Sequence, residues 1–504
     1  MKLRTDNVIR NMIFALLQAI VGMFFPFVVR ACTIKYLGSE YMGLNNLCTS
    51  VLHVLSVTDL GLENAFAFQL YKPVAQRDKE EVCRLLNCYK KIYFVIGMAV
   101  LGIGVMILPF FQHFISSDVP EGVNVYLIFF VYLLNTVISY IFFAYKSLLF
   151  IADQRKDYES IILTVYFCVL YTIQILLLRA HQYYLSVFVM PVCTLIAKIV
   201  RNQIAIRKYP DYNPHGVVTE SQKAALKTDA FSIAVYKFRD ISRDTFDSIA
   251  LSTMKGLVVL SNYQNYYMVM NVPLLLLNMF YANILPSIGN FVISNDSKEI
   301  FDVYKKMAFI MTRMAGWFAI CYCFLIQDFI VIWLGTEYQM SWRIVVLFST
   351  YIYLYGETKI AQIMREGIGM WQQGRIWAAV EMVVNLGLNV LLLVWIGTEG
   401  VILATVISVL LISIPAENRI IFSRCFVGKG RDKLKSMGIN VLWLMGTAGI
   451  VGLLCRIAPH VQYVSFIYKM CVCALIPPLT CTICFYRTEE FRFFQNIMRR
   501  VIRK

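Results

Sequence analysis

The sequence predicts an all-α polytopic membrane protein with about fourteen transmembrane helices. Its 504 residues are 59% hydrophobic and only 15% charged, whereas soluble domains are nearer to half apolar and a quarter charged. Apolar stretches of roughly twenty residues recur along the whole chain, and each is long enough to cross a hydrocarbon core of about 30 Å. The loops between these stretches are too short to hold a soluble domain of ordinary size.

Hydropathy, together with the polar, Gly and Pro residues between apolar segments, sets the bounds of each span. The predicted spans are 9–34, 41–70, 89–111, 123–146, 158–178, 183–205, 228–251, 257–290, 303–334, 342–364, 374–396, 400–418, 437–457 and 462–486. The first span follows a short basic segment without a small-residue cleavage site. We therefore expect it to be retained and not removed as a signal peptide.

The distribution of Lys and Arg predicts how these spans are oriented. Cytoplasmic loops are rich in Lys and Arg, and here about 36 basic residues fall on one side of the arrangement against about 5 on the other. Both termini lie on the basic side, so we expect both in the cytoplasm. Because a single miscounted span would destroy the alternation downstream, the pattern also supports the number of spans. Topology thus explains the net charge of +16, and nucleic acid is not an expected partner.

A weak internal repeat relates two halves of the chain. Three short segments that begin at Tyr41, Leu70 and Tyr89 are echoed at Met254, Leu285 and Tyr304, an offset of about 214 residues. An even number of spans separates the copies, so the repeat is parallel, with its pseudo-two-fold axis along the membrane normal. The predicted organisation is a six-helix lobe at 1–208, a cytoplasmic linker at 209–227, a second six-helix lobe at 228–425, and two further helices with a basic tail at 426–504. In transporters, the substrate path commonly lies between such repeats.

The span 228–251 is unusually charged for a membrane segment. It places Arg239 and Arg243 one helical turn apart, with Asp240, Asp244 and Asp247 on an adjacent stripe. Since charged residues within a span are costly, each marks a polar cavity or a charged partner. One interpretation is a self-paired, water-exposed start of a helix, with Asp240 bound to Arg243.

The other interpretation is a positively charged central cavity lined by Arg30, Arg239, Arg243 and Arg313. Such a cavity suits a diphosphate, because arginine offers a planar fork that binds phosphate through two hydrogen bonds and keeps its charge when desolvated. For Arg30 a second interpretation stays open: it could lie near the outer end of its span and extend its side chain to the membrane surface.

Five carboxylates are candidate sites for a coupling Na⁺ or H⁺, because a buried carboxylate can take up and release a cation within the membrane. They are Asp59, Glu63, Asp247, Glu357 and Glu381. Polar contacts between helices explain many other intramembrane polar residues without any role in transport.

Patterns typical of enzymes and of metal sites are missing from the sequence. It has no phosphate-binding P-loop, no GxGxxG after a strand, no HExxH and no GxSxG. The 14 cysteines are scattered mainly through apolar segments, with no histidines at ligand spacing, and are interpreted as small apolar residues. We therefore expect no enzyme, no metal site and no cofactor, and transport energy that comes from a gradient, the membrane potential or the substrate.

Several motifs along residues 5–425 carry a family resemblance. They include Arg30 with Tyr36 to Leu44, Leu55 to Leu62, Leu70 to Ala75, Asp247 with Gly256 and Ser261 to Tyr263, Leu285 to Asn290, Ile332 to Gly335, Gly374-Arg375, Glu381 with Asn385, and Gly397 to Val401. With these motifs the chain resembles the polysaccharide transporter and O-antigen flippase family of the multidrug/oligosaccharidyl-lipid/polysaccharide (MOP) superfamily. The segment Lys237 to Asp247 departs from the family pattern because it is more charged.

The resemblance implies a MATE-like, fourteen-helix, two-lobed transporter of the bacterial cytoplasmic membrane. It implies that undecaprenyl-diphosphate-linked oligosaccharide is moved to the outer leaflet by alternating access, for surface polysaccharide such as lipopolysaccharide O-antigen or capsule. A polysaccharide polymerase and glycosyltransferases are the implied partners, besides membrane lipids. Two transport alternatives stay open, a lipid II-type peptidoglycan precursor flippase and a cation-coupled drug exporter. From another class, a membrane glycosyltransferase or polymerase, or a scaffold that transports nothing, also stays open.

Overall fold

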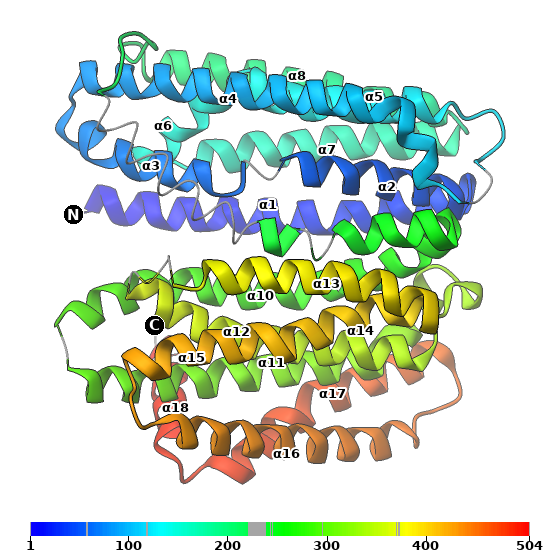
Figure 1. The fold of residues 1–504 in the computed structure, drawn as a ribbon, viewed down its shortest axis with the longest axis vertical. Helices are drawn as coiled ribbons and strands as arrows, with labels where there is room; N and C mark the ends of the chain where they lie inside the picture. The colour runs from blue at the N-terminus through cyan, green and yellow to red at the C-terminus, as the bar shows by residue number, and fades with distance from the viewer. Residues whose placement is uncertain are drawn as a thin grey trace. The chain divides into compact units, whose positions relative to one another are not determined.

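The computed structural model describes residues 2–56, 59–116, 119–219, 238–241, 243, 245–294, 296–368, 370 and 373–502. Over these residues every regular element is helical (Figure 1), which confirms the predicted all-α class. The chain forms two compact units, Met1–Ser261 and Asn262–Lys504. Their boundary falls in the first turns of a long helix, and the linker predicted at 209–227 runs into residues outside the described ranges.

The first unit is a bundle of long helices. Its elements are α1 (Lys2–Tyr36), α2 (Ser39–Leu55), α3 (Asp59–Gln76), α4 (Lys79–Ile107), η2 (Leu108–Phe114), α5 (Val125–Ile141), η3 (Ala144–Lys146), α6 (Ser147–Ala152), α7 (Asp157–Arg179), α8 (Tyr183–Lys208) and a helical segment at 245–255. Helix α7 packs against both α1 and α8, while α5 packs against both α4 and α8 (Figure 1).

The second unit continues from α10, which starts in the first. Its elements are α10 (Leu257–Ser294), α11 (Ser297–Trp333), η4 (Thr336–Tyr338), α12 (Trp342–Gly367), α13 (Arg375–Ile396), α14 (Thr398–Ser408), η5 (Val409–Ser413), α15 (Ile414–Arg424), α16 (Gly430–Cys455), α17 (Gln462–Phe485) and α18 (Glu489–Ile502). Helix α12 lies along α11 and also contacts α14 and α15. The last three helices, α16 to α18, all pack against α11 (Figure 1).

Many of these helices are built to cross a membrane. Among the described residues, nine are long and apolar enough to span, and a tenth span results if α5 is joined to the helix at Ala144–Ala152 across a 45° bend. Large apolar side chains such as Trp395, Leu442 and Leu475 are exposed along α13, α16 and α17. Exposed apolar surface on this scale fits a protein whose surroundings are lipid.

The other four predicted spans, 41–70, 228–251, 257–290 and 342–364, overlap α2 with α3, the helical residues at 238–241, 243 and 245–255, α10, and α12. Helix α12 shows why a span can be polar. Most of its side chains are buried against other helices, so they contact protein and not lipid.

Several helices begin well before the predicted spans. Helix α4 starts at Lys79 and α11 at Ser297, where Asp78 and Asp296 cap the helix ends by accepting hydrogen bonds from the backbone of Glu81 and Glu299, each at 3.0 Å. Hydropathy marks only the part of a helix that lies in lipid, whereas capping fixes where the helix begins.

Candidate functional site

Arg30 lies in the interior of the first unit. It projects from α1, is only 5% exposed, and donates hydrogen bonds to Asn46 Oδ1 of α2 at 3.3 Å and to the carbonyl oxygen of Ser261 in α10 at 3.0 Å. A snorkelling side chain would instead end in water or among lipid headgroups. The snorkelling interpretation of Arg30 is therefore wrong, and its guanidinium is held at a junction of three helices.

Arg239 and Arg243 are also buried, at 5% and 8% exposed. Arg239 forms an ion pair with its neighbour Asp240, with Nη2 at 2.7 Å and Nε at 3.0 Å from the same carboxylate oxygen. The predicted self-pairing of this segment thus occurs at Arg239 and Asp240. Both guanidiniums are buried within the unit, whereas the Asp240 side chain is 41% exposed.

The helical segment at 245–255 is hydrogen-bonded to the end of η2, the short helix that continues α4. Ser252 accepts a hydrogen bond from the backbone of Ser116 at 3.1 Å, and its hydroxyl donates to the carbonyl oxygen of Phe114 at 2.8 Å. Asp247, 3% exposed, lies within this anchored segment. Asp59 and Glu63 belong to α3, but their side chains lie outside the described part of the structure.

Arg313 belongs to the second unit and faces its last helices. Its Nη2 donates to Asn440 Oδ1 of α16 at 2.6 Å. The guanidinium carbon lies 4.5 Å from the ring centre of Trp443 and 4.0 Å from that of Phe485. Within its unit, Arg313 therefore contacts α16 and α17, the two helices beyond the predicted second lobe.

Glu357 lies in the same buried network. Its carboxylate accepts from Lys433 Nζ of α16 at 2.8 Å and from Thr312 Oγ1 of α11 at 3.0 Å. Asn440 Nδ2 approaches it at 3.5 Å, so one amide joins Glu357 to Arg313. The ammonium of Lys433 supplies the positive charge that a coupling Na⁺ would bring to this carboxylate.

Glu381 occupies a separate polar strip between α13 and α14. Ser413 Oγ in η5 donates to it at 2.5 Å. One turn further along α13, Asn385 donates to Thr405 Oγ1 at 3.3 Å, and Asn389 donates to Asn385 at 3.4 Å. All of these residues are buried, so the strip is a protein-enclosed polar path in the second unit.

Comparison with solved structures identifies this arrangement of helices. An inward-closed structure of the lipid II flippase MurJ superposes with a TM-score of 0.68 at 12% sequence identity, covering 97% of this chain and 100% of that one. An inward-facing multidrug MATE transporter of the MOP superfamily gives 0.62 at 13% identity, covering 81% and 95%. The chain has the fold of MOP-superfamily transporters.

Other members of the MOP fold extend the comparison. A MOP-superfamily transporter from Pyrococcus furiosus, described by the reverse polarity of its binding pocket, gives a TM-score of 0.55 at 12% identity and covers 82% of this chain and 93% of its own. The sequence matches no protein-family model and no curated relative. The likeness therefore lies in the fold, and the residues must supply the argument for function.

The sequence does not indicate two buried ion pairs of the second unit. Lys433 counts among the basic residues of the predicted cytoplasmic side, yet it is buried and pairs with Glu357. Arg365 was interpreted in the same way, yet it is fully buried and donates to Glu417 of α15 at 2.7 Å. Charge counting assigns such residues to loops, because the helices that enclose them are visible only in three dimensions.

Proposed function

We propose that this protein is a flippase that moves undecaprenyl-diphosphate-linked oligosaccharide from the cytoplasmic to the outer leaflet of a bacterial cytoplasmic membrane. The observation that carries the proposal is the burial of Arg30, Arg239 and Arg243 within a membrane-helix unit. A guanidinium enclosed there is costly and marks a functional site by default. The MOP fold supplies the transport architecture.

The chemistry of these side chains fits a diphosphate. Each guanidinium offers several N–H donors in one plane, which can bind two phosphate oxygens at once, and it keeps its charge when water is excluded. In the proposal, Arg239 exchanges part of its contact with Asp240 for the substrate, while the contacts of Arg30 to Asn46 and Ser261 fix its direction. Alternating access of the two units then exposes the bound headgroup to each side in turn.

A lipid II-type flippase is the second candidate, and chain length favours it over a drug exporter. The superposition on the lipid II flippase covers 97% of this chain, whereas the superposition on the multidrug transporter covers 81%. A drug exporter for organic cations is also disfavoured by charge, because buried arginines repel such cargo. The motif resemblance favours surface polysaccharide over peptidoglycan precursors.

Coupling to Na⁺ or H⁺ belongs to the proposal as well. Among the candidate carboxylates, Glu357 already has the ammonium of Lys433 as a partner. Glu381 instead accepts from a neutral hydroxyl, Ser413. Asp247, Glu357 and Glu381 are the buried carboxylates at which replacement by the matching amide would test coupling. Cytoplasmic termini, and a polymerase and glycosyltransferases as partners, complete the proposed setting.

The test is a flipping assay on proteoliposomes that contain the full-length protein and a fluorescent undecaprenyl-diphosphate oligosaccharide. Outer-leaflet label is quenched by a membrane-impermeant reductant, so transport appears as the additional fraction of label that the reductant reaches. We expect the double variant Arg239→Ala and Arg243→Ala to reduce the initial rate by at least about tenfold, since each lost charged hydrogen bond weakens binding by about 1.5–3 kcal/mol.

Arg343→Ala is the matched control, because the Arg343 side chain is 82% exposed in the other unit. It should flip the lipid at the unmodified rate. Unchanged transport in the double variant, at equal reconstitution, would remove the proposed role of these arginines. Elongation or release of the glycan by the purified protein would show an enzyme in place of a flippase.

A further inference from the structure

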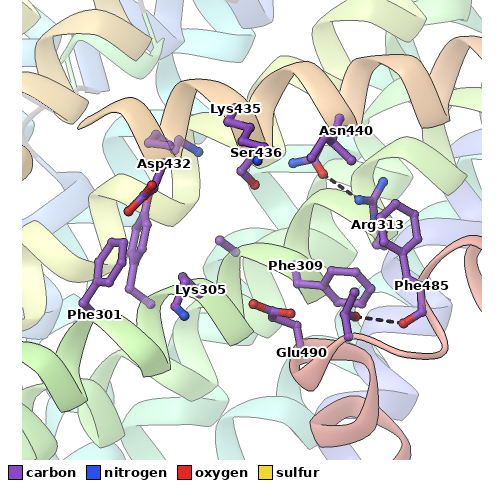
Figure 2. A pocket seen from close by; sticks show the side chains of 15 residues that line it. Phe301, Lys305, Phe309, Arg313, Asp432, Lys435, Ser436, Asn440, Phe485 and Glu490 are labelled. Carbon is purple, nitrogen blue, oxygen red and sulfur yellow. Dashed lines mark hydrogen bonds between the residues drawn. The ribbon is translucent and has the colours of Figure 1, made fainter. Parts of the chain in front are cut away.

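The second unit contains a cavity of about 280 Å³ at one end of its bundle. Helices α11 and α16 form two of its walls, and the turn from α17 into α18 closes a third (Figure 2). Its charged lining comes from Lys305, Arg313, Lys433 and Lys435, with Asp432 and Glu490 as the carboxylates. Basic side chains therefore outnumber acidic ones around this cavity.

The innermost charges of the cavity are not balanced. Arg313 and Lys433 are each 8% exposed, and Glu357 is the carboxylate of their buried network. In the described part of the chain, two cations thus share one carboxylate in this network. Among the residues that the structure describes, the buried Nε and Nη1 atoms of Arg313 have no hydrogen-bond partner. A bound anion would accept hydrogen bonds from the two unused donors of this buried guanidinium. It would also neutralise the excess positive charge of the cluster.

Aromatic rings hold Arg313 in place without neutralising it. Its guanidinium carbon lies 5.1 Å from the ring centre of Phe309 and 4.0 Å from that of Phe485. Cation–π contacts of this kind stabilise the cation while its charge stays available. Figure 2 shows Arg313 between Asn440 and Phe485 at one end of the cavity, and Lys305 and Asp432 toward the other.

A second cavity, of about 160 Å³, shares Phe309 and Arg313 with the first. Most of its lining is apolar and comes from α11, α16, α17 and α18, including Trp317, Trp443 and Pro478. A polar, cationic cavity and an apolar cavity thus meet at Arg313. A molecule with a charged head and a hydrocarbon chain matches both.

The depth of Arg313 also fits a lipid headgroup. Phe485, which contacts Arg313, is the last residue of α17, and the amphipathic helix α18 follows after a short link. The end of a span lies near the membrane interface, and an amphipathic helix lies in that plane. Phe491 and Phe494 of α18 line the apolar cavity at the interface, and Trp317 of α11 and Pro477 of α17 line it further along the spans, so the two cavities together pass from headgroup depth into hydrocarbon.

We infer that these joined cavities bind an anionic phospholipid, with the phosphate on Arg313 and Lys433 and part of an acyl chain in the apolar cavity. The inference does not rest on the proposed transport function. Lys435, which is exposed at the cavity's edge, provides a further cation for the headgroup. A free phosphate would satisfy Arg313 but would leave the apolar cavity unused. A phospholipid and inorganic phosphate are therefore expected to differ in how tightly they bind.

The test is native mass spectrometry of the full-length, delipidated protein with three probes: phosphatidylglycerol, phosphatidylcholine with the same chains, and inorganic phosphate. We expect phosphatidylglycerol to bind about tenfold more tightly than phosphatidylcholine, because the excess charge of the site stays unbalanced with a zwitterion. Inorganic phosphate at equal concentration should not displace it. Equal binding of the two lipids, or displacement by phosphate, would overturn the assignment.

Arg313→Gln should reduce the affinity for phosphatidylglycerol by about tenfold, while Arg343→Gln, at an exposed position away from these cavities, should leave it unchanged. If Arg313→Gln does not fold, Lys435→Gln removes an exposed cation at the edge, and we expect about a threefold loss. Retention of full selectivity by Arg313→Gln would overturn the inference. So would full selectivity in Lys435→Gln, where Arg313→Gln cannot be measured.

Discussion

At the scale of single residues, the second unit balances buried charge across three helices. Glu357 of α12 accepts from Thr312 of α11 and from Lys433 of α16, and Asn440 connects it to Arg313. Removing one member of a buried ion pair leaves its partner uncompensated, which costs more than the pair itself contributes. The loss of stability depends on which charges remain after a substitution, so substitutions in this cluster test the charge balance.

Glu357→Gln should destabilise the protein more than Lys433→Met. The first change leaves two buried cations with no carboxylate, and we expect a loss of about 3–5 kcal/mol in the free energy of unfolding. The second leaves Arg313 and Glu357 joined through Asn440, so its cost should be smaller. Thermal unfolding in a neutral detergent, followed by tryptophan fluorescence, measures both. A larger loss for Lys433→Met would contradict the charge balance described for this cluster.

At the scale of elements, close helix crossings depend on glycine. Gly43 of α2 lies directly against the backbone of Leu257 at the start of α10, and a Cβ there would overlap the Leu257 carbonyl group. These two residues belong to the paired segments of the internal repeat, Tyr41 to Leu44 and Met254 to Leu257. Small residues let helices approach closely in membranes, where packing replaces the hydrophobic effect between helices.

Gly43→Ala should therefore destabilise the protein, because backbone atoms must move to admit one methyl group. Overpacking of this kind typically costs about 1–3 kcal/mol. Gly387→Ala is the matched control, since an added Cβ in the middle of α13 meets no atom within 4 Å. It should be neutral or stabilising by up to about 1 kcal/mol. Equal melting temperatures for the two variants would contradict the close crossing.

Two links between helices, one in each unit, are similar in both sequence and backbone conformation. Leu37 to Tyr41 reads LGSEY, and Leu334 to Tyr338 reads LGTEY. Their glycines take nearly the same backbone angles, with φ 115° and ψ 167° at Gly38 and φ 124° and ψ 167° at Gly335. Residues with a side chain rarely adopt this conformation. These two links are 297 residues apart, whereas the segments of the internal repeat are about 214 residues apart.

At the scale of the whole molecule, the arrangement of spans is the main prediction that remains to be measured. The described residues contain nine helices that pass as spans, ten with the bent α5 segment, and four further predicted spans overlap other helical segments. Polar, enclosed spans are expected where helices surround a substrate path.

Reporter fusions test this topology directly. Because both termini are predicted on the cytoplasmic side, a fluorescent protein fused after Lys504 should fold and fluoresce, and alkaline phosphatase at the same position should be inactive. A fusion after Ala458, in the link between α16 and α17, should give the opposite result. The same reporter pattern at both positions would mean that the span count is wrong.

The sequence by itself determined the fold class, the membrane setting and the approximate place of the nine or ten apolar spans among the described residues. These features follow from local properties: the apolar content of about twenty consecutive residues, and the charge of the loops beside them. It also indicated Arg30, Arg239 and Arg243 as candidate functional residues, because a charge within an apolar stretch can be recognised without a structure.

Only the tertiary structure decided which charges meet. It assigned Lys433 to Glu357 and Arg365 to Glu417, placed Arg313 among α16 and α17, and enclosed Arg30 where snorkelling had been an alternative. Such pairings join residues 50 or more positions apart, as with the separation of 76 between Lys433 and Glu357. Hydropathy and loop charge carry no information about which helix faces which, and packing between helices decides that.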